Sequence, residues 1–162
     1  MNTENKILSF AAARAQSDAW RDQGERIVLA NGCFDILHVG HLRYLQAARD
    51  LGSRLIVAVN DDDSVRALKG PGRPILPTAE RARLLAALRA VDAVVIFSSP
   101  TVTPLLEALR PAIHAKGTDY TPDSVPERAA ADRLGIRVAI AGDPKRHATR
   151  ELLSEIRRRA GH

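Results

Sequence analysis

The chain has 162 residues, of which 45% are hydrophobic, 27% charged and 4% aromatic, and its net charge is +5. This length and apolar content indicate one domain with an ordinary core and exclude a disordered chain. No apolar stretch reaches the about 18 residues of a membrane span, and the N-terminus lacks the apolar core of a secretory signal. We expect a single cytoplasmic domain over residues 1–162, with no membrane partner.

Basic residues gather near the C-terminus. Residues 145–162 hold six Lys or Arg and two Glu, which accounts for +4 of the net charge. Positive charge suits the last turn of a helix, so we interpret 145–162 as a basic C-terminal helix with a solvated end. A nucleic-acid-binding module on 145–159 is the alternative from another class. The chain has only six aromatic residues for base stacking, so no nucleic-acid partner is expected.

Short apolar runs alternate with segments of helical periodicity along the chain. A helix is expected at 9–21 within an N-terminal extension of residues 1–24, and helical spacing recurs at 42–51, 84–88, 105–109 and 152–156. Five apolar runs are continuous, which indicates strands covered on both faces: 27–30, 55–59, 93–97, 112–115 and 136–141. Strands joined by helical crossovers run parallel. We therefore expect an α/β fold with a doubly wound, Rossmann-like parallel sheet of about five strands.

Two segments between these elements carry their own signals. Residues 69–77 contain Gly70, Pro71, Gly72 and Pro74 and are expected to form a loop near the ligand-binding edge of the sheet. Ser124 and Glu127 have the spacing of a capping box and predict the start of a helix before the last strand.

The segment after the first apolar run places two of the five histidines together. His38 and His41 lie three residues apart, so both rings can face one side of a first helical turn. Free backbone N–H groups at a helix start bind anions, and Gly40 lets a phosphate approach the backbone. The pattern predicts a triphosphate cradle. Ordinary histidines at a helix start are the plain alternative, and a zinc site would need ligands beyond Cys33 and Asp35.

These residues also support a family resemblance. The segment Gly32-Cys33-Phe34-Asp35-x-x-His38-x-Gly40-His41 resembles the signature of the cytidylyltransferase-like nucleotidyltransferases. Further segments resemble bacterial D-glycero-D-manno-heptose 1-phosphate adenylyltransferases, namely Leu68-Lys69-Gly70, Arg73-Pro74, residues 80–92 and Lys116-Gly117-Thr118-Asp119-Tyr120. The resemblance covers about residues 26–156. It implies a nucleotidyltransferase that transfers AMP from ATP, with Mg²⁺, to heptose 1-phosphate. The products are ADP-heptose, a precursor for lipopolysaccharide or surface glycans, and pyrophosphate.

The resemblance also implies roles for single residues. His38 and His41 would hold the triphosphate and stabilise charge during transfer, Lys69 would neutralise phosphate, and Asp35 would organise its loop. The expected contacts of ATP or the sugar phosphate are Asn31, Gly32, Cys33, Phe34, Asp35, Gly40, Asn60, Arg73, Arg81, Lys116, Gly117, Asp119, Tyr120 and Thr149. The family carries a Ser-Thr type pair at the start of the last helix, where this chain has Ala148 before Thr149.

Plainer interpretations stay open for several of these residues. They are solvated lysines for Lys69 and Lys116, a surface ion pair for Arg73, an ion pair with the neighbours of Glu80 for Arg81, turn residues for Asp119 and Tyr120, and an N-cap for Thr149. Among enzymes, a cytidylyltransferase acting on glycerol 3-phosphate shares the histidine motif and is the alternative. A homodimer is the expected assembly. About 24 residues precede the first strand, so any partner sugar kinase is expected on a separate chain.

Overall fold

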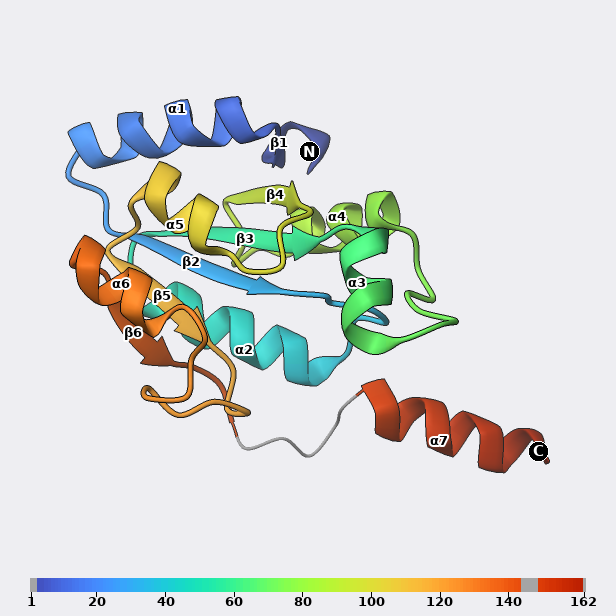
Figure 1. The fold of residues 1–162 in the computed structure, drawn as a ribbon. Helices are drawn as coiled ribbons and strands as arrows, with labels where there is room; N and C mark the ends of the chain where they lie inside the picture. Colours follow the sequence, from blue (N-terminus) through green and yellow to red (C-terminus); the bar gives the residue numbers. More distant parts are fainter. Residues whose placement is uncertain (1–2, 144–148, 162) are drawn as a thin grey trace.

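The structure, a computed structural model, describes residues 3–143 and 149–161. Helices cover both faces of a six-stranded sheet in which every strand pair is parallel (Figure 1). The strand order is β1-β4-β3-β2-β5-β6. The strands are β1 (Ile7–Leu8), β2 (Ile27–Gly32), β3 (Arg54–Asn60), β4 (Ala93–Phe97), β5 (Ile113–Lys116) and β6 (Arg137–Ile140). The doubly wound, Rossmann-like α/β class is confirmed.

The number of strands differs from the sequence prediction, which counted about five. The sixth is β1, in which Ile7 and Leu8 pair with Val94 and Val95 at the edge of the sheet. Two residues are too few to show the continuous apolar pattern that identified the other strands. This edge strand is therefore a product of tertiary pairing.

The helices divide between the two faces of the sheet. They follow a short 3-10 helix at Thr3–Lys6 and are α1 (Phe10–Asp22), α2 (Val39–Asp50), α3 (Asp62–Lys69), α4 (Thr78–Ala87), α5 (Thr103–Leu109), α6 (Arg128–Leu134) and α7 (Thr149–Ala160). Helices α2 and α4 pack on one face with Val28 and Val57, and α1, α5 and α6 pack on the other with Leu29 and Ile56. Alternate residues of each strand thus enter two different cores. None of the described helices is long and apolar enough to cross a membrane.

The direction of the chain across the sheet reverses at β2. From β2 the chain adds β3 and β4 on one side, and then crosses to β5 on the other side of β2. The carboxyl ends of β2 and β5 therefore flank a topological switch point, where ligands of such sheets bind. Ala30 pairs with Ala115, so Asn31 and Lys116 follow side by side at this edge.

Three local predictions need correction or limits. Helix α3 has no counterpart among the predicted elements. Ser124 and Glu127 do not form a capping box, because Glu127 itself is the N-cap of α6 and the Ser124 hydroxyl accepts a hydrogen bond from the Thr121 backbone N–H at 2.8 Å. The C-terminal helix begins at Thr149, and the predicted stretch 145–148, with Ala148, lies outside the described residues. Helix α7 points away from the sheet in Figure 1 and has no buried residue.

Candidate active site

The loop between β2 and α2 holds the two histidines. His38 is the N-cap of α2, and its Nδ1 atom accepts a hydrogen bond from the Gly40 backbone N–H at 3.1 Å. The proton of the neutral His38 ring therefore lies on Nε2. The His38 and His41 rings stack with centroids 3.8 Å apart, and Phe34 packs edge-on against His41 at 5.3 Å. The two imidazoles thus lie together at the positive end of the helix dipole.

Two residues of this loop have left-handed backbone angles, with φ of 49° at Phe34 and 52° at Ile36. Such angles cost an L residue on the order of 1–3 kcal/mol, and β-branched Ile36 tolerates them least. The side chains of Phe34 and of Asp35, which are 4% and 2% exposed, anchor the loop in the core. Buried anchors therefore hold the loop in a conformation that the local sequence disfavours.

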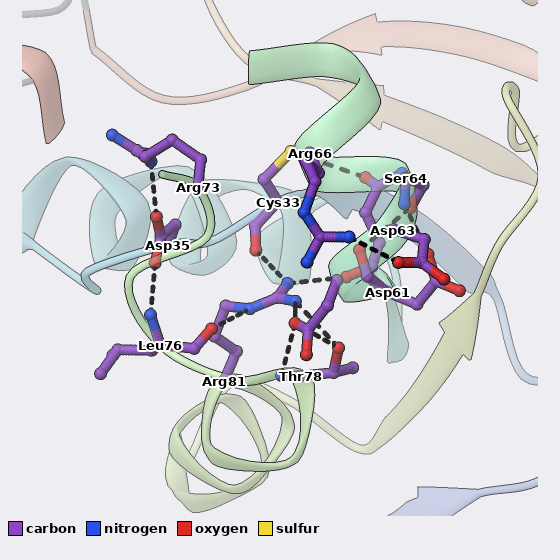
Figure 2. A network of polar contacts seen from close by, with 12 residues as sticks. Cys33, Asp35, Asp61, Asp63, Ser64, Arg66, Arg73, Leu76, Thr78 and Arg81 are labelled. Carbon is purple, nitrogen blue, oxygen red and sulfur yellow. Dashed lines mark hydrogen bonds and ion pairs between the residues drawn. The ribbon is translucent and has the colours of Figure 1, made fainter. Parts of the chain in front are cut away.

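Asp35 connects this loop to two other parts of the chain. Its carboxylate accepts hydrogen bonds from the Ile75 and Leu76 backbone N–H groups at 2.9–3.0 Å and forms an ion pair with Arg73 Nε at 2.8 Å (Figure 2). Its carbonyl oxygen accepts a hydrogen bond from Thr149 Oγ1 at 2.9 Å. Asp35 therefore holds the loop before α4 and the start of α7 against the histidine loop. Arg73 is therefore ion-paired through Nε in this structure, and its contact with ATP or the sugar phosphate stays a prediction.

Arg81, on α4, is fully buried and lies behind these loops. Figure 2 shows its guanidinium surrounded by oxygen atoms from three segments of the chain. Its five N–H groups donate, at 2.7–3.0 Å, to the carbonyl oxygens of Leu76, Cys33 and Asn60, the Asp62 carboxylate and the Thr78 hydroxyl. No guanidinium N–H is left for a phosphate in this conformation, so the structure favours an ion pair with Asp62 that fixes the ends of β2 and β3.

The ends of β2 and β3 bring Cys33 and Asn60 together. The Cys33 thiol lies 3.9 Å from Asn60 Oδ1, and the Asn60 amide donates to Ser64 Oγ at 3.3 Å. Burial raises the pKa of the Cys33 thiol, and the charge of Lys69 is the largest effect opposing it. The thiol is therefore protonated at neutral pH, and Lys69, exposed at the end of α3, adds positive charge on this side of the site.

The end of β5 forms the other side of the site. Lys116 is 6% exposed, and its ammonium lies 3.4 Å from Asn31 Oδ1 and 4.6 Å from the centre of the Tyr120 ring. Asn31 Oδ1 also accepts a hydrogen bond from Nε2 of the buried His114 at 2.9 Å. Burial, and then the charge of Lys116, lower the pKa of His114 to about 3, so this imidazole is neutral. Two donors thus fix the orientation of the Asn31 amide.

The turn after β5 leaves room beside the lysine. A Cβ atom on Gly117 would contact nothing within 4 Å, and Asp119 is exposed. The Thr118 hydroxyl donates to the Asp143 carbonyl oxygen at 2.9 Å, which ties the turn to the end of β6. The open space at Gly117 allows a ligand to approach the Lys116 end of the sheet.

The predicted residues therefore form two groups with Cys33 between them. Asp35, Arg73 and Arg81 lie around the loop before α4, whereas Asn31 and Lys116 lie at the end of β5. The charge of Lys69 acts on the Cys33 thiol, and Cys33 is in turn among the groups that shift the pKa of Lys116. Among residues 3–143 and 149–161, no group of three or more His, Cys, Asp or Glu is arranged to hold a metal ion. The zinc alternative therefore lacks a ligand set in this part of the chain.

Three residues of this region were missed by sequence reasoning. Tyr44 on α2 donates to the Ala115 carbonyl oxygen at 2.7 Å and holds α2 against β5. His114 was hidden inside an apolar strand, and Glu127 was assigned to a capping box. A polar residue in the middle of a buried strand was the one available signal, and it pointed to His114.

The parallel sheet, its switch point and the histidine loop define a nucleotidyltransferase-type domain. The family model described as "Cytidylyltransferase-like" matches residues 29–144, and the chain belongs to this family. Among curated proteins, it is 49% identical over 136 residues to the bifunctional protein HldE of Methylobacillus flagellatus, a match that covers 84% of this chain and 28% of that protein. It is 41% identical over 160 residues to HldE of Geobacter metallireducens, covering 99% and 33%. The chain thus spans about a third of the length of these relatives.

Solved structures give a consistent result. The lipopolysaccharide core biosynthesis protein of Thermoplasma volcanium superposes with a TM-score of 0.66 at 28% identity, covering 75% of this chain and 100% of that chain. Pantothenate synthetase of Thermus thermophilus superposes with the same TM-score over 96% of this chain and 70% of that one, but at 17% identity, so it supports the fold alone.

Proposed function

We propose that this chain is an adenylyltransferase that transfers AMP from ATP to D-glycero-D-manno-heptose 1-phosphate. The products are ADP-heptose, a precursor for lipopolysaccharide or surface glycans, and pyrophosphate. The observation that carries this proposal is the stacked pair His38 and His41 at the start of α2, next to the switch point. The likeness to HldE proteins over most of the chain, together with the segments 68–74 and 116–120, supports the heptose subgroup.

The reaction requires little covalent chemistry from the protein. A phosphate oxygen of the sugar phosphate attacks the α-phosphorus of ATP, and the bond from that phosphorus to the pyrophosphate oxygen breaks in line. The attacking phosphate is already ionised at neutral pH, so no strong base is needed. The chain therefore acts by positioning the two substrates and by stabilising negative charge, and the Cys33 thiol does not act as a nucleophile.

The positions of single residues support the roles that we propose for them. His38 and His41 donate to the triphosphate, because His38 carries its proton on Nε2 and the first N–H groups of α2 are next to them. Lys69 and Lys116 neutralise phosphate from opposite sides, and the Asn31 amide donates beside Lys116. Asp35 and Arg81 hold the loops that frame these groups. Asp119 and Tyr120 contact the sugar or base, and Thr149 contacts phosphate at the start of α7.

Mg²⁺ fits this arrangement as a partner of ATP. The described residues offer no cluster of carboxylates that would hold the ion by themselves, so it would be bound mainly by the triphosphate. Bound there, it neutralises charge on the phosphate oxygens. We also propose that the chain acts in the cytoplasm, where ATP is available, as one domain and as a homodimer.

The experiment that tests the function is a comparison of substrate pairs. Purified protein with Mg²⁺ is given ATP or CTP together with heptose 1-phosphate, glycerol 3-phosphate or phosphopantetheine, and pyrophosphate release is measured. ATP with heptose 1-phosphate is expected to be the best pair. A site that hydrogen-bonds several sugar hydroxyls rejects acceptors lacking them by up to about 10⁴–10⁵ in kcat/KM.

Two outcomes would overturn the proposal. A preference for CTP with glycerol 3-phosphate would support the cytidylyltransferase alternative, which shares the histidine motif. No pyrophosphate from any pair would contradict a nucleotidyltransferase of this kind.

A further inference from the structure

The Lys116 ammonium lies at the switch point and forms no hydrogen bond with a carboxylate in the described part of the chain. Its two nearest neutral partners are Asn31 Oδ1 at 3.4 Å and the face of the Tyr120 ring at 4.6 Å. With 6% of the residue exposed, water replaces few of its lost interactions. A buried ammonium needs a compensating negative charge to stay ionised.

Glu127, the N-cap of α6, supplies this charge from outside the predicted site. It is 5% exposed, and its Oε1 atom accepts a hydrogen bond from the Val102 backbone N–H at 3.3 Å. Its Oε2 atom is buried, has no hydrogen-bond partner, and lies 3.9 Å from the Lys116 ammonium. One carboxylate oxygen is therefore fixed to the backbone while the other faces the lysine.

We propose that Glu127 is a positioning residue, whose buried carboxylate holds Lys116 in place and in its charged form so that the ammonium can bind a phosphate group of the substrates. This inference rests on the proposed function for the identity of the reaction. Glu127 itself touches no substrate in this arrangement, because its free oxygen is buried, shielded from solvent and 3.9 Å from the ammonium.

The charges around Lys116 come from several elements. Burial lowers the pKa of Lys116 and the Glu127 carboxylate raises it, whereas Cys33 adds to this second effect only as the thiolate. His114, on the same strand, is neutral. Burial, followed by the Glu127 and Asp119 charges, raises the pKa of Tyr120, so its hydroxyl also stays neutral. Glu127 is therefore the carboxylate that compensates the lysine most directly.

The first test measures the titration of Lys116 itself. The chain has only four lysines, Lys6, Lys69, Lys116 and Lys145, so the ¹³Cε signal of Lys116 can be assigned by its loss in Lys116→Arg. Glu127→Gln removes the charge but keeps an oxygen for the Val102 N–H. The expected result is a lower pKa of Lys116 in Glu127→Gln than in the wild type.

A matched control tests for general effects of losing a carboxylate. Glu107→Gln makes the same change in an exposed ion pair that joins Glu107 on α5 to Arg133 on α6, and the Lys116 pKa is expected to stay at its wild-type value. An unchanged Lys116 titration in Glu127→Gln, in a protein that melts as a folded domain, would overturn the inference. Glu127→Asp, which keeps the charge, is expected to restore the wild-type titration at least in part.

The second test measures the pH dependence of turnover between about pH 6 and about pH 9.5. In Glu127→Gln the alkaline fall of kcat/KM is expected at lower pH, with a loss of roughly tenfold at the alkaline end for each pH unit of displacement. Arginine stays charged throughout this range, so in a Lys116→Arg background the same change is expected to leave the position of the alkaline fall unaltered. A displacement of equal size in both backgrounds would overturn the inference.

The two tests separate the inference from the proposed function. If wild-type protein releases no pyrophosphate from any substrate pair, the function fails, whereas the NMR titration still decides whether Glu127 keeps Lys116 charged. If turnover is present and the pKa of Lys116 is the same in Glu127→Gln as in the wild type, the inference alone fails.

Discussion

Arg81 gives the sharpest prediction for stability. Arg81→Met keeps an apolar stem of similar length but removes five hydrogen bonds, and three of their acceptors are the backbone oxygens of Leu76, Cys33 and Asn60. Each of these carbonyl bonds is worth about 1–1.5 kcal/mol. The Asp62 carboxylate is 41% exposed, so water replaces much of that ion pair and it is not counted. The expected loss is about 3–5 kcal/mol, a large part of a typical domain stability of roughly 5–15 kcal/mol.

Thermal and urea unfolding followed by circular dichroism measure this loss. At about 2–4 °C per kcal/mol for a chain of this size, Arg81→Met is expected to melt roughly 6–20 °C below the wild type. The control is Arg83→Met on the same helix, whose side chain is 67% exposed and whose loss is expected to stay below about 0.5 kcal/mol. A lysine side chain has three N–H donors but lacks the planar guanidinium group. The melting temperature of Arg81→Lys is therefore expected to lie between those of Arg81→Met and the control Arg83→Met. An Arg81→Met protein that melts within about 2 °C of the control would refute the reasoning.

Three further predictions concern the histidines, the buried imidazole and the C-terminal helix. His38→Ala and His41→Ala are each expected to lower turnover about 10²–10³-fold with the fold intact, because each removes a donor to developing phosphate charge; near wild-type pyrophosphate release in both would contradict the site. His114 has a folded pKa of about 3 against 6.5 as its ordinary value, so within this window the unfolded chain binds the extra proton and stability falls as the pH falls. By about pH 5 the loss is about 2 kcal/mol, and melting temperatures should fall less with acid in His114→Leu than in the wild type; parallel curves would contradict this cause. Deleting the chain from Arg157 onward is expected to change turnover little, because arginines at this helix end pair with Glu155 on an exposed surface; a salt-sensitive affinity for DNA or RNA that disappears with the deletion would instead support the nucleic-acid alternative.

The elements that local pattern defines well were predictable from the sequence. Strands β2 to β5 are buried over most of their length, so their apolar runs are continuous, whereas the edge strand β6 was predicted as covered on both faces but has no buried residue. Helix α1 begins after Ser9, whose hydroxyl accepts a hydrogen bond from the Ala12 backbone N–H as an N-cap should. Strand β1 was not predictable, because its two residues become a strand only by pairing with β4. Helix α3 was missed because its eight residues present a single buried side chain, Val65.

In the site, the histidine motif was predictable from the sequence, whereas the long-range contacts around it were not. The histidines and the glycine lie three residues apart at most, so their spacing alone indicates that they act together. The partners of Arg81 and of the Asp35 carboxylate lie up to 48 and 41 residues away, respectively, across loops that the local sequence does not orient. Glu127 lies in a hydrophilic segment just before a helix, and this local pattern indicates a helix cap as readily as a site residue. Its meeting with Lys116 depends on how α6 packs beside β5.

The hydrogen bond between Thr149 and Asp35 joins a segment of the site near the start of the chain to one near its end. These residues are 114 positions apart, whereas β2, β3 and β4 find their partners from nearby segments in chain order. During synthesis, the strands that follow the histidine loop can pair as they emerge, since domains fold progressively from the N-terminal side. The histidine loop receives its contact from Thr149 only after the sheet is complete. A nascent chain that has already folded its sheet therefore lacks a finished site until α7 has left the ribosome.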